Sequence, residues 1–307
     1  MVAELARAGK KMVFSGAGTK LGRVEGERVG TAKLAKIVEY IPSDQVVTVQ
    51  AGVPLAALQE ALRGERQRLS LDPPFGARAT LGGIVATGSF GPRRARSGAV
   101  RDLILGATMV RADGVVAKSG GKVVKNVAGF DLPKLLCGSF GTLGLIATAT
   151  FRVHPLPETS AVLRATGVSS EGVLALVKRV REAQLEPAAW VATRTAPGRF
   201  DVDLLFEGFE AGVNQQAKKL ADLTRVDPAV FDEHAKLREA LPVQLRALPT
   251  ELPAVERSAT GRFTWYPTLG LGFADGPPQP PPAPKARALH DAVKQRFDPQ
   301  GLLPSLP

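Results

Sequence analysis

Cysteine is nearly absent from this sequence, since Cys137 is the single one among 307 residues. One cysteine excludes an intrachain disulfide and any metal site built from several cysteine ligands. Histidine is almost as scarce, with three copies far apart in the chain: His154, His234 and His290. We therefore expect no metal centre.

Long apolar runs are also absent, and none approaches the roughly 20 residues that a membrane-spanning helix needs. Residues 1–14 include basic side chains but no apolar stretch followed by a small-residue cleavage site, so we expect no secretion signal. Both observations predict a cytoplasmic protein. The 44% of hydrophobic and 22% of charged residues are typical of a soluble globular chain, long enough for one large domain or two moderate ones.

Acidic residues are outnumbered, because 29 Asp and Glu stand against 40 Lys and Arg, a net charge of +11. Part of the excess lies between residues 91 and 134, where Lys or Arg occupies positions 93, 94, 96, 101, 111, 118, 122, 125 and 134. Single-strand nucleic-acid binders interleave such charges with aromatic side chains, but this stretch holds Phe130 alone. A solvated basic face explains the charge better, and we expect no nucleic-acid partner.

Local hydrophobic patterns predict several elements of the first half of the chain. Residues 46–50 are rich in β-branched side chains and predict a strand. Leu55, Leu58 and Leu62 follow at helical spacing and predict a helix with one buried face. The turn sequence at 111–114 predicts a hairpin between the apolar segments on either side of it.

Glycine and proline divide the chain into three parts. Most of the 32 glycines lie in residues 1–154, whereas residues 155–245 show the pattern strand, helix, strand, strand, helix. This order is roughly ferredoxin-like and predicts a small α+β cap domain. Residues 246–307 contain a proline-rich connector at 277–284 and then an amphipathic pattern at 285–297, which predicts a helix that packs back on the first domain.

Three glycine-rich loops are the main chemical candidates: residues 15–22, 79–91 and 138–144. Glycine lets the backbone approach a ligand closely, and consecutive amides form a concave donor array that suits phosphate. The first loop alone is equally compatible with a plain tight turn, and Leu21 and Gly22 depart from the nicotinamide Rossmann fingerprint. Three such loops in one domain predict a ligand longer than a single phosphate, of dinucleotide size.

The order of these loops resembles the FAD-binding domain of the vanillyl-alcohol oxidase and para-cresol methylhydroxylase (PCMH) superfamily. The resemblance depends on SGAGTKLG at 15–22, A-T-x-G-G at 79–83, an R-x-G-x-x-R-D stretch at 96–102 and G-S-x-G-T-L-G at 138–144. The block GGKVVKNVAGFD at 120–131 is similar to the family of FAD-binding E subunits of bacterial glycolate oxidase. Residues 72–74 and 297–301 fit the same family.

The resemblance implies an α+β fold, a two-lobed PCMH-type FAD-binding domain with a small ferredoxin-like α+β cap. It also implies FAD held non-covalently, chiefly by main-chain amides, because the first loop offers only Thr19 and Lys20 where covalent relatives use a histidine or another nucleophile. One departure is the sequence Leu-Pro-Ser at 303–305, where relatives have N-P-G. Carried over by position, the expected FAD-binding residues are Gly16, Ala17, Gly18, Thr19, Lys20, Thr80, Leu81, Gly82, Gly83, Ala86, Thr87, Ser89, Gly141, Thr142 and Gly144.

Oxidation of a 2-hydroxy acid requires a base for the hydroxyl proton, a cation for the carboxylate and a hydride acceptor. His154 is a candidate base, although a histidine at a strand end is the simpler explanation. Four basic residues are candidate carboxylate ligands or plain surface charges: Arg93, Arg94, Arg96 and Lys125. Lys122, Lys125 and Asn126 suit either a flavin or subunit contact or an exposed basic hairpin. No catalytic residue is assigned from the sequence.

The resemblance also implies partners, because the larger relatives carry a histidine-containing segment of the H-x-G-D-G-N type that this chain lacks. Substrate oxidation would then lie mainly on a larger FAD-binding oxidase subunit, completed by an iron–sulfur subunit, with the complex peripheral to the membrane. The expected function is that of an FAD-binding subunit of a glycolate oxidase-type complex, with a small 2-hydroxy acid such as glycolate as substrate. The alternative is a non-catalytic flavin electron-transfer or assembly subunit.

Overall fold

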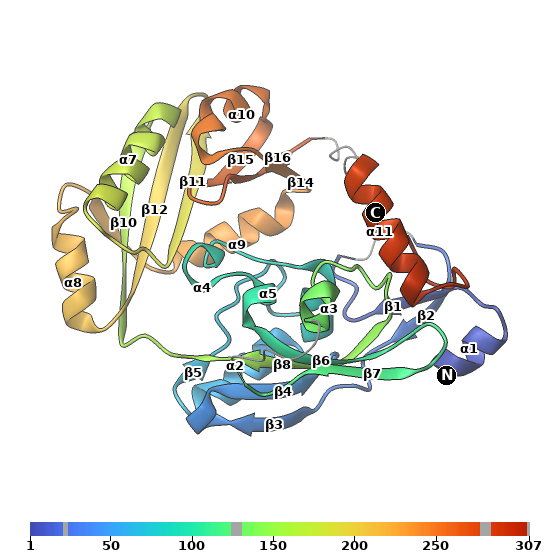
Figure 1. Ribbon diagram of the computed structural model, residues 1–307. Helices are drawn as coiled ribbons and strands as arrows, with labels where there is room; N and C mark the ends of the chain where they lie inside the picture. Colours follow the sequence, from blue (N-terminus) through green and yellow to red (C-terminus); the bar gives the residue numbers. More distant parts are fainter. Residues whose placement is uncertain (21–23, 124–130, 277–283, 306–307) are drawn as a thin grey trace. The chain divides into compact units, whose positions relative to one another are not determined.

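The computed structural model of the chain describes residues 1–20, 24–123, 131–276 and 284–305 (Figure 1). Helices and strands are mixed along the chain, which confirms the α+β fold class. The end of the first glycine loop, most of the 120–131 motif and most of the predicted connector lie outside the described residues.

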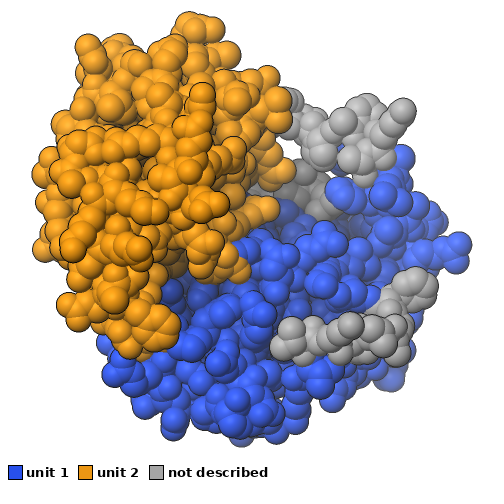
Figure 2. Space-filling model, turned by 60° about the vertical axis from the view of Figure 1, so that its left-hand side comes forward, with its two compact units in different colours: residues 1–90, 98–155, 281–307 blue, residues 91–97, 156–280 orange. Residues whose placement is uncertain are grey.

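Two compact units make up the chain (Figure 2). Unit 1 comprises residues 1–90, 98–155 and 281–307, and unit 2 comprises residues 91–97 and 156–280. The domain boundaries expected from the sequence, at 1–154, 155–245 and 246–307, stay predictions.

The main sheet of unit 1 has five antiparallel strands in the order β3-β4-β8-β6-β7. Its strands are β3 (Ile37–Ile41), β4 (Val46–Gln50), β6 (Ile104–Val110), β7 (Val116–Gly120) and β8 (Leu145–Arg152). The helices of unit 1 are α1 (Val2–Arg7), α2 (Leu55–Arg63), α3 (Leu81–Thr87), α5 (Val100–Leu103), α6 (Leu132–Leu136) and α11 (Pro284–Phe297). Two short pairs complete it: β1 (Met12–Ser15) with β2 (Glu27–Gly30), and β5 (Gln67–Arg68) with β9 (His154–Pro155).

The predicted elements of this unit form where local periodicity is strong. The β-branched segment β4 buries Val46, Val47 and Val49 and pairs with β3 and β8. The predicted leucine stripe lies on the buried face of α2. The expected hairpin is β6–β7, joined at the predicted turn. The core between the sheet, α2 and α3 supports the glycine loops at one edge of the unit.

The end of the chain is fastened to unit 1 by a buried carboxylate. Asp298, just past α11, is 3% exposed; it accepts a bond from Lys294 Nζ at 2.5 Å and from the amides of Leu302 and Leu303 at 2.9 and 2.8 Å. The carbonyl of Leu302 in turn accepts a bond from the Met12 amide at 2.7 Å. This clasp therefore holds the chain end against β1, the strand that leads into the first glycine loop.

Replacing Asp298 with alanine is expected to lower the free energy of unfolding by about 3 kcal/mol. Two amides lose their partner, and the largely buried ammonium of Lys294 keeps only the Leu303 carbonyl, at 2.9 Å. Urea denaturation followed by circular dichroism measures the change. The matched control is Asp291→Ala, because Asp291 is exposed on the same helix. Equal midpoints for the two variants would contradict the clasp.

Unit 2 is built on one seven-stranded antiparallel sheet in the order β13-β10-β12-β11-β15-β16-β14. Its strands are β10 (Thr159–Val168), β11 (Ala189–Ala196), β12 (Arg199–Gly208), β13 (Thr224–Val226), β14 (Val243–Arg246), β15 (Thr260–Tyr266) and β16 (Leu271–Asp275). Its helices are α4 (Arg94–Ser97), α7 (Ser170–Glu182), α8 (Glu210–Lys218), α9 (Val230–Ala240) and α10 (Leu252–Ser258). Helices α7, α8 and α10 pack on one face of the sheet, and α9 covers part of the other (Figure 1).

Candidate functional site

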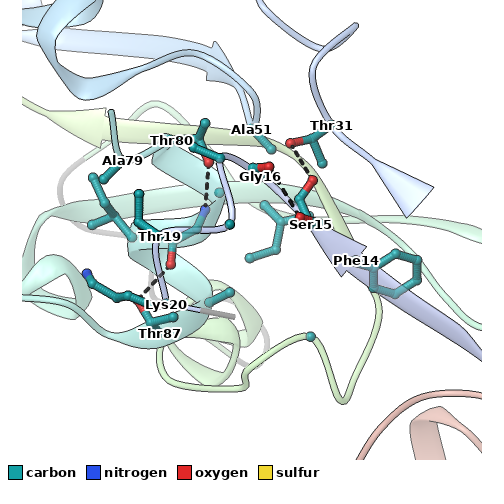
Figure 3. A pocket seen from close by; sticks show the side chains of 18 of the residues that line it. Phe14, Ser15, Gly16, Thr19, Lys20, Thr31, Ala51, Ala79, Thr80 and Thr87 are labelled. Carbon is teal, nitrogen blue, oxygen red and sulfur yellow. Dashed lines mark hydrogen bonds between the residues drawn. The ribbon is translucent and has the colours of Figure 1, made fainter. Parts of the chain in front are cut away.

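The three predicted glycine loops meet at one pocket in unit 1 (Figure 3). Its empty space is about 770 Å³, a volume that includes the part open to solvent. Its walls are Phe14, Ser15, Gly16, Ala17, Gly18, Thr19, Lys20, Thr31, Ala51, Ala79, Thr80, Gly82, Gly83, Ile84, Ala86, Thr87, Phe140, Gly141, Gly144, Leu145 and Ile146.

The first wall begins where β1 ends. Strand β1 runs parallel to β2, and the carbonyl of Ser15 accepts a bond from the Thr31 amide at 2.9 Å. Beyond Ser15 the chain leaves the strand, and the amides of residues 16–19 donate no hydrogen bond to the residues that the structure describes. Backbone donors need a partner, so these amides are available to a ligand or to water.

The second wall is the start of α3, which packs very closely against the first loop. The Thr80 hydroxyl caps α3 by accepting a bond from the Gly83 amide at 3.4 Å. A Cβ atom added to Gly16 would overlap Thr80 Oγ1, and one added to Gly82 would lie 2.5 Å from the Cβ of Ala51. Glycine is therefore required at both positions by close approach rather than by backbone conformation.

The third wall is the 138–144 loop, which is tied to the C-terminal end of α3. The Gly138 amide donates to the Val85 carbonyl at 3.0 Å, and the Phe140 amide donates to the Ala86 carbonyl at 2.7 Å. Gly141 adopts a left-handed conformation with φ of 75°, which glycine tolerates without steric cost. These contacts fix the loop along the pocket beside the first wall.

The charge of the pocket comes from one side chain. Lys20 is the single ionisable residue among the described residues that line it, so no carboxylate opposes an anion there. The Lys20 ammonium donates to the Ser89 hydroxyl, which lies 2.6 Å from Thr87 Oγ1; that hydroxyl donates to the Gly83 carbonyl at 2.7 Å. The pocket is therefore suited electrostatically to an anionic ligand.

Twelve of the fifteen residues expected from the sequence line this pocket, and the other three lie beside it. Leu81 is fully buried in the core, and the Thr142 hydroxyl donates to the Ser139 carbonyl at 2.7 Å. Ser89 contacts the ammonium of Lys20. That any of these residues binds a cofactor stays a prediction.

Sequence reasoning missed several wall residues because other elements bring them in. Thr31 follows β2, Ala51 follows β4, and Leu145 and Ile146 begin β8. Phe140 lies inside a predicted loop, but its side chain had no motif to mark it. The signal for Phe14 was its place at the end of the strand before the first loop.

Three of the four basic residues considered as carboxylate ligands do not line the pocket: Arg93, Arg94 and Arg96. Arg93 and Arg96 belong to unit 2 and form ion pairs with Glu207 and Glu186. Lys122 pairs with Glu39 at 2.5 Å. Arg94 belongs to α4 of the same unit, while Lys125 and Asn126 lie outside the described residues.

Two reactive side chains of unit 1 do not line the pocket. Burial lowers the pKa of His154 below its ordinary value, and the charges of Arg152 and Arg68 lower it further. Burial raises the pKa of Cys137 to about 12, so its thiol stays protonated. Among the described residues, no group of three or more His, Cys, Asp or Glu could hold a metal ion, and no helix is long and apolar enough to cross a membrane.

Residues 1–120 match the model of a protein family described as an FAD binding domain. The chain therefore contains an FAD-binding domain of the PCMH type, as the loops predicted. Its sequence is also similar to FAD-linked oxidoreductases, among them a glycolate oxidase E subunit and a D-lactate dehydrogenase.

Three relatives support this assignment. The chain is 39% identical over 180 residues to glycolate oxidase subunit GlcE of Escherichia coli, covering 57% of this chain and 50% of that protein. It is 33% identical over 153 residues to glycolate oxidase subunit GlcD of Bacillus subtilis, covering 50% of this chain and 33% of that protein. It is 36% identical over 165 residues to D-lactate dehydrogenase of Archaeoglobus fulgidus, covering 53% of this chain and 37% of that protein. The chain thus spans half or less of the length of these relatives.

A solved structure of alkyldihydroxyacetonephosphate synthase shares the fold. Its TM-score is 0.75 at 15% sequence identity, with 98% of this chain and 72% of that chain covered. At this identity the likeness concerns the fold alone.

Proposed function

We propose that the chain binds FAD non-covalently in the unit 1 pocket and acts as a subunit of a glycolate oxidase-type complex. The complex would oxidise a small 2-hydroxy acid to the 2-oxo acid and pass the electrons to a larger FAD-binding subunit and an iron–sulfur subunit. The single observation that carries the proposal is the convergence of the three glycine loops on one pocket without a carboxylate.

The residues present fit a dinucleotide with two phosphates. The amides of residues 16–19 lack partners among the described residues, and Lys20, the next residue along the chain, lines the same pocket. Such donors suit a pyrophosphate. Gly141 and Gly144 on the third wall and Gly82 and Gly83 on the second would let the ligand lie close to the backbone. FAD, when bound, supplies the hydride acceptor.

A non-covalent mode is supported by the side chains of the pocket. Covalent attachment of a flavin needs a nucleophile, and the lining residues that the structure describes include no histidine, cysteine or tyrosine. The same lining has no group that would serve as a general base near neutral pH. This favours catalysis that needs a partner subunit, and it also supports the alternative of a flavin electron-transfer subunit.

The test is a visible absorption spectrum of the purified chain after incubation with FAD and desalting, followed by glycolate without oxygen. A retained flavin spectrum would support the cofactor site, and its loss on desalting would contradict it. The same measurement on the chain co-expressed with its complex partners separates the two functions. The complex is measured with and without this chain. Bleaching by glycolate that requires this chain supports an oxidase subunit. Bleaching that is the same without this chain supports an electron-transfer or assembly role.

Lys20→Gln is expected to raise the Kd for FAD about tenfold, since a charge-assisted bond to phosphate is lost. The variant should also show a weaker dependence of Kd on salt, because screening acts on the removed charge. Titration of the apoprotein at low and high ionic strength measures both effects. Lys118→Gln, at an exposed position of β7, is the control; an equal effect there would point to net charge rather than to this site.

A further inference from the structure

Two aromatic rings, Phe14 and Phe140, line the pocket at places that no glycine-loop motif explains. Phe14 is the next-to-last residue of β1, and Figure 3 shows it away from the end of the pocket where Lys20 and Thr87 lie. Aromatic residues make up only 6% of the chain. Within the described residues, neither ring stacks on another aromatic ring. The described part of the chain therefore supplies no aromatic stacking partner for either ring.

The backbone of Phe140 is held in an unfavourable conformation. Its φ is 51°, in the left-handed region, and Gly138 and Gly141 on either side have φ values of 81° and 75°. A bulky residue in this region costs about 1–2 kcal/mol and persists only where the surroundings enforce it. The bonds from Gly138 and Phe140 to the end of α3 supply that constraint. Glycine would fit this backbone with less strain than phenylalanine.

The Phe140 side chain gains little from burial in return. It remains 42% exposed, so a large part of its apolar surface is still open to contact with a ligand. Phe14 is half-buried and lies against the same loop: a Cβ atom on Gly141 would be 3.7 Å from Phe14 Cδ2. Leu145 and Ile146 line the same pocket and are buried. The pocket thus has a polar part at Lys20 and an apolar, aromatic part at Phe14.

We propose that Phe14 and Phe140 determine ligand specificity by stacking against a flat heteroaromatic ring of the bound ligand. This inference rests on the proposed function, because it concerns the same pocket. Stacked and edge-on aromatic contacts are favourable beyond the area that they bury. The ring is either the adenine or the isoalloxazine of FAD, and the nucleotide used as a probe distinguishes them.

The experiment compares Phe140→Gly, Phe140→Leu and Phe140→Tyr with the unaltered chain. Phe140→Gly removes the ring and the backbone strain together, Phe140→Leu keeps apolar bulk without a flat face, and Phe140→Tyr keeps the ring. The melting temperature of each apoprotein and its Kd for FAD, ADP and FMN are measured. The matched control is Phe75→Gly, because Phe75 has φ of 61° in the same unit and does not line the pocket.

Phe140→Gly and Phe140→Leu are expected to raise the Kd for FAD about tenfold, Phe140→Tyr less than threefold, and Phe75→Gly not at all. The melting temperature of the Phe140→Gly apoprotein should be unchanged or higher. If the ring served only to stabilise the fold, its removal would lower the melting temperature. If the affinity of Phe140→Gly and Phe140→Leu for ADP falls in the same way, the phenylalanine rings contact the adenine. If their affinity for FMN falls in the same way, the phenylalanine rings contact the isoalloxazine.

An unchanged Kd for FAD in both Phe140→Gly and Phe140→Leu overturns the inference while leaving the proposed function intact. A lower melting temperature in both variants, with the Kd of the folded fraction unchanged, overturns it as well. Failure of the unaltered chain to bind FAD is the separate result that overturns the proposed function and this inference with it.

Discussion

Replacement of Gly16 by valine is expected to abolish the retention of FAD on desalting, with binding weakened about a hundredfold. Any side chain at this position would overlap Thr80 Oγ1, the atom that caps α3. The first loop would have to move away from α3. This movement would displace Lys20 and the amides of residues 16–19, which have no partner among the described residues. Losing two or three ligand hydrogen bonds together accounts for the size of the effect.

Fluorescence titration with FAD measures the loss, and circular dichroism shows whether the fold persists. The matched control is Gly30→Ala, since a Cβ atom on Gly30 of β2 would meet nothing within 4 Å and the residue does not line the pocket. If Gly16→Val retains as much FAD as the unaltered chain, FAD binding does not depend on close contact between the first glycine loop and α3.

A double-mutant cycle separates this overlap from other effects of a larger residue. Thr80→Ala removes the hydroxyl and its capping bond, which costs the helix about 1 kcal/mol. It also opens space for a Cβ atom at position 16. The loss of FAD affinity caused by Gly16→Ala should therefore be smaller in the Thr80→Ala background. Additive losses would mean that the overlap does not govern binding.

The predictions that succeed from sequence alone are those carried by local chemistry. The strand β4, the leucine stripe of α2 and the β6–β7 hairpin depend on periodicity and turn residues within a few positions. The glycine loops are also visible locally, because runs of glycine at such density are rarely needed for a simple turn. Their meeting at one pocket was inferred from ligand size and from a resemblance.

The features that the sequence does not reveal depend on contacts between segments that are far apart in the chain. The sequence patterns did not predict β15 and β16. Strand β15 pairs with β11 across 71 to 73 residues, and β16 pairs with β14 across 25 to 31 residues. Thr31 reaches the pocket because β2 pairs with β1 in parallel. The close approach of Gly16 to Thr80 is a property of two segments far apart in the chain, so a glycine in a loop gives no sign of it.

Unit 2 contains the second position at which a large effect is expected, the buried Asp203 of β12. Asp203 is fully buried and accepts two bonds of 2.8 Å from Arg164, its cross-strand neighbour on β10. It lies 2.7 Å from Nε2 of His234, which belongs to α9. One carboxylate therefore links two strands of the sheet to the helix that covers it.

Asp203→Ala is expected to lower the free energy of unfolding by about 3–5 kcal/mol, because Arg164 keeps a largely buried charge without its partner. Urea denaturation measures the change. The matched control is Asp222→Ala: Asp222 also forms a two-bond pair with an arginine, Arg179, but both side chains are about half exposed. Its removal should cost less than about 1 kcal/mol, and equal costs would contradict the role of burial.

The same carboxylate makes the stability of the chain depend on pH in acid. Burial alone would raise the pKa of Asp203, but the hydrogen bonds from His234 and Arg164 and their charges outweigh it, so the pKa lies below its ordinary value. A carboxyl group whose pKa is lower in the folded state stabilises the fold above the unfolded pKa of about 3.9. This contribution to the free energy of unfolding is lost as the pH falls from the unfolded pKa down through the lower pKa of the folded state. Below about pH 4, the urea midpoint of the unaltered chain should therefore fall more steeply with decreasing pH than that of Asp203→Asn, which keeps the shape without the titrating group. If the urea midpoints of the two proteins fall equally with decreasing pH, carboxylates other than Asp203 control the loss of stability in acid.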